Sequence, residues 1–379
     1  MSALYLHIPF CSSKCAYCGF YSIPSLKRKA DFLSALKQEM TARKDYLQGE
    51  TIATIYFGGG TPSLLTIEEL GMIFHWINEM FEVDPNAEIT LEANPDTLSF
   101  DYLKGLRALG ANRLSIGIQS FFDNDLKYLS RRHDSRHALR CVPWAKEAGF
   151  ENISLDLIYG LPTSDADQWQ RNLDAFFEMD VPHLSAYALT LEPNSILTKQ
   201  IDMGKVLPVN EDDALRDYAI LCQKAKESGF EHYEISNFCK PGRYSRHNSG
   251  YWFGVPYLGL GPSAHSYNGV SRQWNVGSVE RYVGERRQKT GDGRQKMEEK
   301  EILTTEQQYD EYVMLRLRTM WGIDLSYIKR EMGERFADHC ERQAQPLVEQ
   351  GKLSQTHEVF YLNDEQMLFA DGIAEALFW

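Results

Sequence analysis

Apolar and polar positions alternate in blocks along the first 230 residues of the chain. Six short blocks are dominated by aliphatic and aromatic residues, a composition typical of buried strands. They cover residues 4–8, 53–57, 88–92, 113–118, 153–158 and 184–189. Between them, apolar residues recur every three or four positions, as they do on one face of a helix. The helices predicted in this way cover residues 27–48, 66–82, 100–109, 123–130, 135–148, 166–179 and 210–228.

Strands and helices that alternate in this way predict parallel strands joined by right-handed crossovers. The strand blocks are apolar on nearly every position, which is typical of a sheet covered on both faces. The pattern therefore predicts an α/β fold. An open doubly wound sheet and a barrel-like sheet satisfy it equally well, and periodicity alone does not separate them.

The last third of the chain follows a different pattern. Residues 285–304 are charged and contain Gly-Asp-Gly, so they are interpreted as an exposed connection. A helical stripe of apolar residues then begins at Tyr309. Three more helices are predicted at residues 324–332, 335–350 and 364–378. Two short strands are predicted at residues 351–354 and 358–362. We expect three parts, at residues 1–235, 236–304 and 305–379, because a chain of 379 residues exceeds what one core usually holds.

Three cysteines, Cys11, Cys15 and Cys18, follow the first predicted strand within eight residues. Clustered thiolates are the ligands of zinc or of an iron–sulfur cluster. Structural sites of both kinds usually use four protein ligands, so three cysteines leave one coordination position open for chemistry. The other four are isolated and are interpreted as structural, and they are Cys141, Cys222, Cys239 and Cys340.

Further candidate ligand contacts lie where the next strands end. The turn Gly58-Gly59-Gly60 follows the second strand, where glycines let the backbone approach a ligand and present N–H groups to it. Glu92, Gln119 and Asp156 are polar side chains in or just after three successive apolar strands. Burying one such group is costly unless it is hydrogen-bonded, and three in succession favour a shared polar ligand.

The motif Cys-x-x-x-Cys-x-x-Cys on an N-terminal loop resembles the cluster motif of the radical S-adenosylmethionine (SAM) superfamily. The resemblance implies a partial (β/α)6 barrel and a [4Fe–4S] cluster whose fourth iron is chelated by SAM. Residues 88–96, 114–121 and 154–162 are similar to the anaerobic coproporphyrinogen III oxidase family, which ends in a small winged-helix-like α+β domain. The SAM contacts that this similarity implies are Tyr5, Tyr17, Gly59, Gly60, Thr61, Glu92, Gln119, Arg131 and Asp156.

Two features resemble the heme chaperones of this family more than its oxidases. The oxidases extend the cluster motif by one more cysteine, and this chain has Phe20 there. The second feature is a His-Asn-x-x-Tyr-Trp motif, whose implied heme contacts are His247, Asn248, Tyr251 and Trp252. His232 and His265 are alternative axial ligands. The nearest cations for the heme propionates are Arg243, Arg246 and Arg272.

The resemblance therefore implies a heme chaperone that binds heme, a [4Fe–4S] cluster and SAM and delivers heme to acceptor proteins, without a catalytic residue of its own. The alternative is a radical enzyme, either an oxygen-independent coproporphyrinogen III oxidase or another enzyme acting on a tetrapyrrole. A net charge of −13 disfavours nucleic-acid binding, including a DNA-binding wing. No signal peptide or membrane span is expected, so a cytoplasmic location is predicted, with a membrane-bound acceptor still open.

Overall fold

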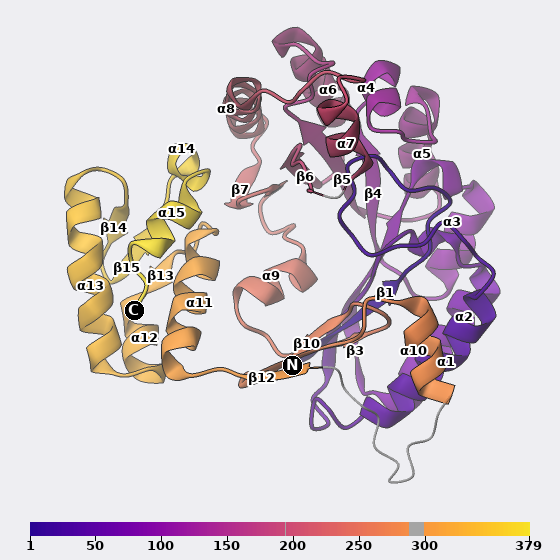
Figure 1. Ribbon diagram of the computed structural model, residues 1–379, viewed down its shortest axis with the longest axis horizontal. Coiled ribbons are helices and arrows are strands. Elements are labelled where there is room, and N and C mark those ends of the chain that lie inside the picture. The colour runs from indigo at the N-terminus through magenta and orange to yellow at the C-terminus, as the bar shows by residue number, and fades with distance from the viewer. Residues whose placement is uncertain (194, 288–298) are drawn as a thin grey trace.

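A computed structural model describes residues 1–193, 195–287 and 299–379. Its centre is a sheet whose first six strands are parallel and lie in sequence order, each joined to the next by helices (Figure 1). These strands are β1 Ser2–Ile8, β2 Ile52–Gly59, β3 Val83–Ala93, β4 Arg113–Gln119, β5 Asn152–Tyr159 and β6 His183–Ala188. The helices are α1 Lys29–Arg43, α2 Ile67–Met80, α3 Phe100–Ala108, α4 Asp123–Tyr128, α5 Ser135–Glu147, α6 Ala166–Glu178, α7 Ile196–Asp202 and α8 Glu211–Glu227.

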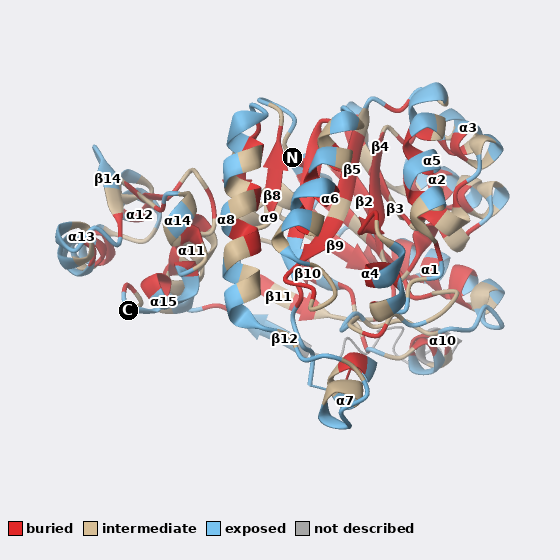
Figure 2. Ribbon diagram, turned by 90° about the horizontal axis from the view of Figure 1, so that it is seen from above, coloured by how far each residue is buried: buried red, intermediate tan, exposed pale blue. Residues whose placement is uncertain are grey.

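The predicted α/β class and the partial (β/α)6 barrel are confirmed. The strands are buried and the outer faces of the covering helices are exposed (Figure 2). Local sequence supports this arrangement, because α2 begins with a capping box between Thr66 and Glu69 and buries its apolar face. Asp134 and Asp165 cap α5 and α6 in the same way, each accepting a backbone N–H three residues on.

Residues 231–302 extend the same sheet on both sides. The additional elements are β7 Glu231–Glu234, β8 Asn237–Cys239, α9 Arg246–Trp252, β9 Tyr257–Leu260, β10 His265–Tyr267, β11 Ser271–Trp274, α10 Val279–Arg287 and β12 Glu299–Ile302. The β8 strand pairs with β6, whereas β9 pairs with β1, so the order is β12-β11-β10-β9-β1-β2-β3-β4-β5-β6-β8-β7. Helix α9 contacts β2 and lies between the β9 side and the β8 side of this sheet (Figure 1).

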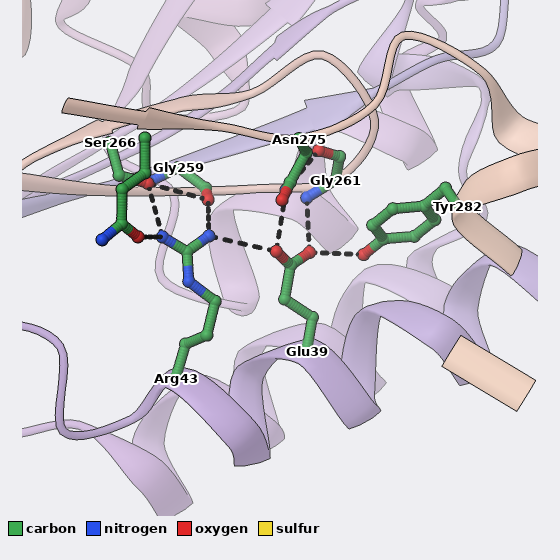
Figure 3. Close-up of polar contacts among 8 residues, drawn as sticks. Glu39, Arg43, Gly259, Gly261, Ser266, Asn275 and Tyr282 are labelled. Atoms are coloured by element: carbon green, nitrogen blue, oxygen red, sulfur yellow. Dashed lines mark hydrogen bonds and ion pairs between the residues drawn. The ribbon is translucent and has the colours of Figure 1, made fainter. Parts of the chain in front are cut away.

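A buried ion pair fastens this extension to the barrel (Figure 3). The Glu39 carboxylate on α1 accepts hydrogen bonds from Arg43 Nη1 at 3.1 Å and from Gly261 N at 2.9 Å. The Asn275 amide and the Tyr282 hydroxyl donate to it as well, at 2.7 and 2.5 Å. Arg43 in turn donates to the carbonyl of Gly259 and to the side chains of Ser266 and Gln273. The α1 helix therefore holds β9, β10, β11 and α10 together, because each contributes a partner to one network.

The C-terminal part has a hydrophobic core of its own, which is made of buried side chains drawn from the segment Tyr309 to Leu377. Its elements are α11 Thr305–Leu317, β13 Ile323–Asp324, α12 Leu325–Glu331, α13 Glu334–Glu349, β14 Ser354–Thr356, β15 Val359–Tyr361, α14 Asp364–Met367 and α15 Ala370–Glu375. The three strands form a separate antiparallel sheet. A β-bridge between Glu234 and Thr319 joins this part to the barrel, and a hydrogen bond of 2.9 Å joins His232 and Asp364.

Several predicted boundaries are wrong. The helix expected at 27–48 ends at Arg43, and the chain then turns until Gln48 takes a left-handed conformation with φ +54°. The helix expected at 364–378 is two short helices, because a tight turn from Gln366 to Phe369 interrupts it. The connection expected at 285–304 is partly α10 and partly β12, and its remainder, 288–298, lies outside the described residues. The division at residues 235 and 304 stays a prediction.

Candidate functional site

A cavity of about 400 Å³ lies at the carboxyl ends of the parallel strands, beneath the loop that follows β1. All three motif cysteines line it, and so do all nine residues predicted to contact SAM. Asn248 of the predicted heme motif lines it too. Side chains that lie more than 200 residues apart in the sequence therefore meet at one site, where parallel α/β sheets usually bind their ligands.

The cysteine loop is held at both ends by main-chain bonds. Cys11 N donates to Ile23 O at 3.1 Å, and Leu197 N donates to Ala16 O at 2.8 Å. Beneath the loop, Ala16 joins a small apolar cluster with Leu129, Ile158, Leu161, Leu189 and Leu197. The half-buried thiols therefore sit on a fixed loop facing the cavity.

Three thiols on one loop are a donor set that suits an iron–sulfur cluster. Within the described ranges, no three Cys, His, Asp or Glu side chains converge as ligands of one ion. A four-iron cluster binds each thiolate on a different iron, so its ligands lie farther apart. Two of the thiols already receive hydrogen bonds, Cys11 from the Thr61 hydroxyl at 3.5 Å and Cys15 from Arg131 Nη1 at 3.4 Å. Burial raises the pKa of the Cys18 thiol.

The glycine turn after β2 packs tightly against the cysteine loop. Gly59 has φ +102°, and a Cβ there would approach the His7 ring to 2.6 Å. A Cβ on Gly60 would lie 2.6 Å from the carbonyl oxygen of Phe10. Two of the three N–H groups expected to face a ligand are already bonded, because Gly59 N donates to Glu92 and Gly60 N donates to Ile8 O. The next N–H along, that of Thr61, donates to Phe10 O. Glycine is needed here for close packing of two loops.

Two half-buried carboxyls, Glu92 and Asp156, line the floor of the cavity. Glu92 accepts hydrogen bonds from the Tyr56 hydroxyl at 2.8 Å and from Gly59 N at 3.2 Å. Burial raises the pKa of Glu92 to about 7, and it raises the pKa of Asp156 as well. Asp156 accepts a hydrogen bond from Ser115 at 3.1 Å. The floor therefore offers oxygen acceptors suited to hydroxyl or ammonium groups of a ligand.

Gln119 and Arg131 form the wall next to the cysteines. Gln119 ends β4 with φ +66°, a conformation that costs energy for a residue with a side chain, where the pairing with β5 is irregular. Arg131 Nη2 donates to Asn94 Oδ1 and to Gly117 O, both at 2.7 Å. Arg131 Nε is buried and has no partner among the described residues. Arg131 is thus part of the cavity and not a solvated residue at a helix end.

The predicted heme motif forms α9, and its histidine points into the barrel. His247 is only 2% exposed, and its two ring nitrogens bond to the hydroxyls of Thr54 at 2.8 Å and Tyr251 at 2.9 Å. Its ring stacks on Tyr56 with a centroid distance of 4.9 Å. Burial lowers the pKa of His247 to about 3, so the ring is neutral at physiological pH. Neither nitrogen is available for a metal unless one of these bonds breaks.

A family model described as the radical SAM superfamily matches residues 5–176, and the HemN C-terminal domain model matches residues 303–369. The heme chaperone HemW of Bacillus subtilis (strain 168) is 34% identical over 98% of this chain and 98% of its own length. The chain belongs to the HemW family. HemW of Escherichia coli (strain K12) is 38% identical over 69% of both chains.

The HemW-family chain also shares its fold with a solved structure. Coproporphyrinogen III oxidase (HemN) from Escherichia coli, a radical SAM enzyme, aligns with a TM-score of 0.85 and 25% identity. The alignment covers 99% of this chain and 89% of that chain. The barrel and the C-terminal domain thus follow the HemN architecture together, in agreement with the expected winged-helix-like ending. In the described parts of the chain, no helix is both long and apolar enough to span a membrane.

In this HemW-family chain, most of the other candidate heme groups already have partners of their own. His232 bonds to Asp364 of the C-terminal part, and exposed His265 stacks on Trp274. Arg272 forms an ion pair with Glu311 at 2.6 Å. The remaining two cations, Arg243 and Arg246, line a second cavity of about 360 Å³ near the amino ends of β3 and β5.

The cavity residues that sequence reasoning missed include Asn94, Ser115 and Tyr187. Asn94 lies in the segment 88–96, whose family resemblance was a usable signal. Ser115 is a polar residue inside an apolar strand, the same signal that identified Asp156. Tyr187 gave no signal, because a tyrosine in a strand is ordinary.

Proposed function

We propose that this chain binds heme and transfers it to acceptor proteins, with a [4Fe–4S] cluster on Cys11, Cys15 and Cys18 and SAM beside it. The observation that carries the proposal is the end-to-end similarity to a heme chaperone, over 98% of both chains. When bound, the cluster would supply an electron-transfer centre with one iron open to chelation by SAM. The reducing cytoplasm is the proposed location, because all seven cysteines are free thiols.

The cavity supports a shared site for SAM and heme. Glu92 and Asp156 supply acceptors at the floor, and Arg131 has an N–H without a partner for a carboxylate. Asn248 reaches the same cavity from α9. The predicted heme motif therefore adjoins the predicted SAM pocket, which lets binding of one ligand affect the other.

Phe20 weighs against the oxidase alternative. This side chain is 70% exposed and lines the cavity at the position where the oxidases are expected to carry a further cysteine. An apolar ring at the mouth offers a surface for stacking on a flat macrocycle instead of a thiol. The architecture shared with HemN keeps the oxidase as the second candidate.

The deciding experiment compares the two activities on one anaerobic preparation with the cluster reconstituted. We expect saturable heme binding with a Soret band and no conversion of coproporphyrinogen III to protoporphyrinogen IX. HemN from Escherichia coli serves as the positive control for the oxidase assay. Conversion at rates comparable with that control, without heme binding, would reject the chaperone proposal.

A pair of variants tests the role of His247. If its Nε2 ligates heme iron, His247→Ala weakens heme binding and shifts the Soret band. Tyr251→Phe then strengthens binding or leaves it unchanged, because it removes the hydroxyl that occupies Nε2. Equal losses in both variants, with an unshifted Soret band, would assign His247 a packing role inside the barrel. The chaperone proposal would survive that result.

A further inference from the structure

The helix α9 turns its histidine toward the barrel and away from solvent. His247 is 2% exposed, and its ring nitrogens bond to the hydroxyls of Thr54 and Tyr251. Its ring also stacks on Tyr56, which lines the main cavity. Thr54 and Tyr56 both belong to β2. Movement of α9 away from β2 would therefore break the bond to Thr54 and uncover the histidine ring.

The amino end of α9 is fixed to the barrel. The Glu88 carboxylate on β3 accepts hydrogen bonds from Arg246 N at 3.2 Å and from His247 N at 3.0 Å. Ser245 caps the helix by accepting from Asn248 N at 3.3 Å. Because these bonds satisfy N–H groups of the first turn, they anchor this end of the helix. A movement that exposes His247 would therefore swing the carboxyl end of α9 outward.

The C-terminal part holds that carboxyl end and also the segment just before the helix. The Trp321 ring lies 4.8 Å from the ring of Phe253, which follows α9, and 5.7 Å from the ring of Tyr244, which precedes it. The Arg316 guanidinium lies 4.6 Å from the centre of the Phe253 ring. Figure 1 shows α9 between the barrel and the C-terminal part. Trp321 and Arg316 thus form a clasp that touches both flanks of α9.

The clasp lies at a joint between two separate hydrophobic cores. The buried apolar side chains of the barrel and of the C-terminal part form two distinct clusters, although Leu368 packs on the barrel cluster. The described polar links across the joint include Ile235 N to Arg318 O, Met320 N to Tyr233 O, His232 to Asp364 and Arg272 to Glu311. Contacts of this kind resemble a transient interface, which opens without unfolding either core.

We propose that the C-terminal part is an autoinhibitory clasp on α9, and that release of the contact between Trp321 and Phe253 exposes His247. In the closed position both ring nitrogens of the histidine are occupied. A ligand that needs the open position has an apparent affinity reduced by the fraction of open molecules. Weakening the clasp therefore strengthens its binding. The inference rests on the proposed function only for the identity of that ligand, heme.

Trp321→Ala in the cluster-free full chain tests the clasp without heme. Hydrogen–deuterium exchange of residues 248–253, followed by mass spectrometry, should become about five- to tenfold faster, as expected for the loss of one aromatic contact. Exchange in β1 to β6 should not change. Diethyl pyrocarbonate, which acylates neutral imidazole, should modify His247 faster by a similar factor. Exposed His75 on α2 is the internal reference for this reagent.

Two further variants make the comparison specific. Trp379→Ala is the matched control, because it removes a tryptophan of the same part that packs on Phe336 and His339 instead, and it should leave α9 unchanged. Trp321→Phe keeps an aromatic ring and should restore most of the protection. If Trp321→Ala does not fold, Phe253→Ala removes the same contact from a side chain that is 49% exposed.

Unchanged exchange and unchanged labelling of His247 in folded variants would overturn the proposal. Faster exchange throughout the barrel, or an equal effect of Trp379→Ala, would indicate general destabilisation and count against it. After cluster reconstitution, heme should associate faster with Trp321→Ala than with the unsubstituted chain. Equal association rates, with His247 exposed in the variant, would show that the clasp does not control the ligand. If neither chain binds heme, the proposed function fails, and exchange and labelling still decide whether the clasp holds His247.

Discussion

The buried pair formed by Glu39 and Arg43 gives the most quantitative prediction about stability. Glu39 is fully buried and accepts hydrogen bonds from Arg43, Gly261, Asn275 and Tyr282, whereas Arg43 is 7% exposed and also donates to Gly259, Ser266 and Gln273. Removing one partner of such a pair leaves an uncompensated charge in the core. Glu39→Gln and Arg43→Met should therefore each lower the free energy of unfolding by about 3–5 kcal/mol.

The double variant separates charge pairing from simple loss of contacts. With both charges absent, no charge of this pair remains uncompensated, and the amide oxygen introduced by Glu39→Gln can still accept at one of the two positions, either from the Asn275 amide or from Gly261 N and the Tyr282 hydroxyl. The loss in the double variant should then fall short of the sum of the two single losses by about 2–3 kcal/mol. Urea denaturation of the cluster-free chain, followed by tryptophan fluorescence and far-UV circular dichroism, measures all four proteins.

The exposed pair of Lys329 and Glu334 supplies the control. Its side chains are 58% and 66% exposed, so Lys329→Met and Glu334→Gln should show a coupling energy under about 0.5 kcal/mol. Additive losses for Glu39 and Arg43 would refute the reasoning, because the two side chains would then contribute independently of each other's charge.

Three further predictions follow from single contacts. Gly60→Ala should abolish SAM binding, because the Cβ of the alanine would lie 2.6 Å from Phe10 O. Equilibrium dialysis measures this, and SAM affinity equal to that of the unsubstituted chain would contradict it. Burial raises the pKa of Glu234 to about 7 from an ordinary 4.5, so the folded state holds the proton more tightly than the unfolded state. The free energy of unfolding should therefore fall by about 3 kcal/mol as the pH rises from 4.5 to 7. Glu234→Gln should remove this part of the pH dependence, as measured by urea denaturation. Asp364→Asn should weaken the bond to His232 and speed limited proteolysis between the barrel and the C-terminal part, and an unchanged cleavage rate would count against a docking role.

The alternating core of the fold could be predicted from sequence, but its extension could not. The strands β1 to β6 are long and apolar, and each is followed by a helical stripe, so their order follows from periodicity and the crossover rule. The strands β9 to β12 have only three or four residues each. Their pairing depends on distant partners such as Glu39, and no local pattern in the sequence shows this.

The candidate site shows the same division. The cysteines and Glu92 could be located because motif spacing and polar residues in apolar strands are local signals. The orientation of His247 could not, because its motif is equally compatible with an exposed heme ligand and with a buried ring between Thr54 and Tyr251.

The pairing of β1 with β9 has a consequence for biosynthesis. The cysteine loop is translated within the first twenty residues, yet β1 keeps one unpaired edge until residues 257–260 leave the ribosome. The hydroxyl of Tyr21, just beyond the third cysteine, accepts a hydrogen bond of 2.7 Å from Val279 N, and this donor is synthesised later still. During most of its synthesis the nascent chain therefore carries an open strand edge next to three exposed thiols, a combination prone to aggregation and oxidation. We therefore expect a cluster on these thiols to be inserted stably only after about three quarters of the polypeptide has been made, as a late event in maturation.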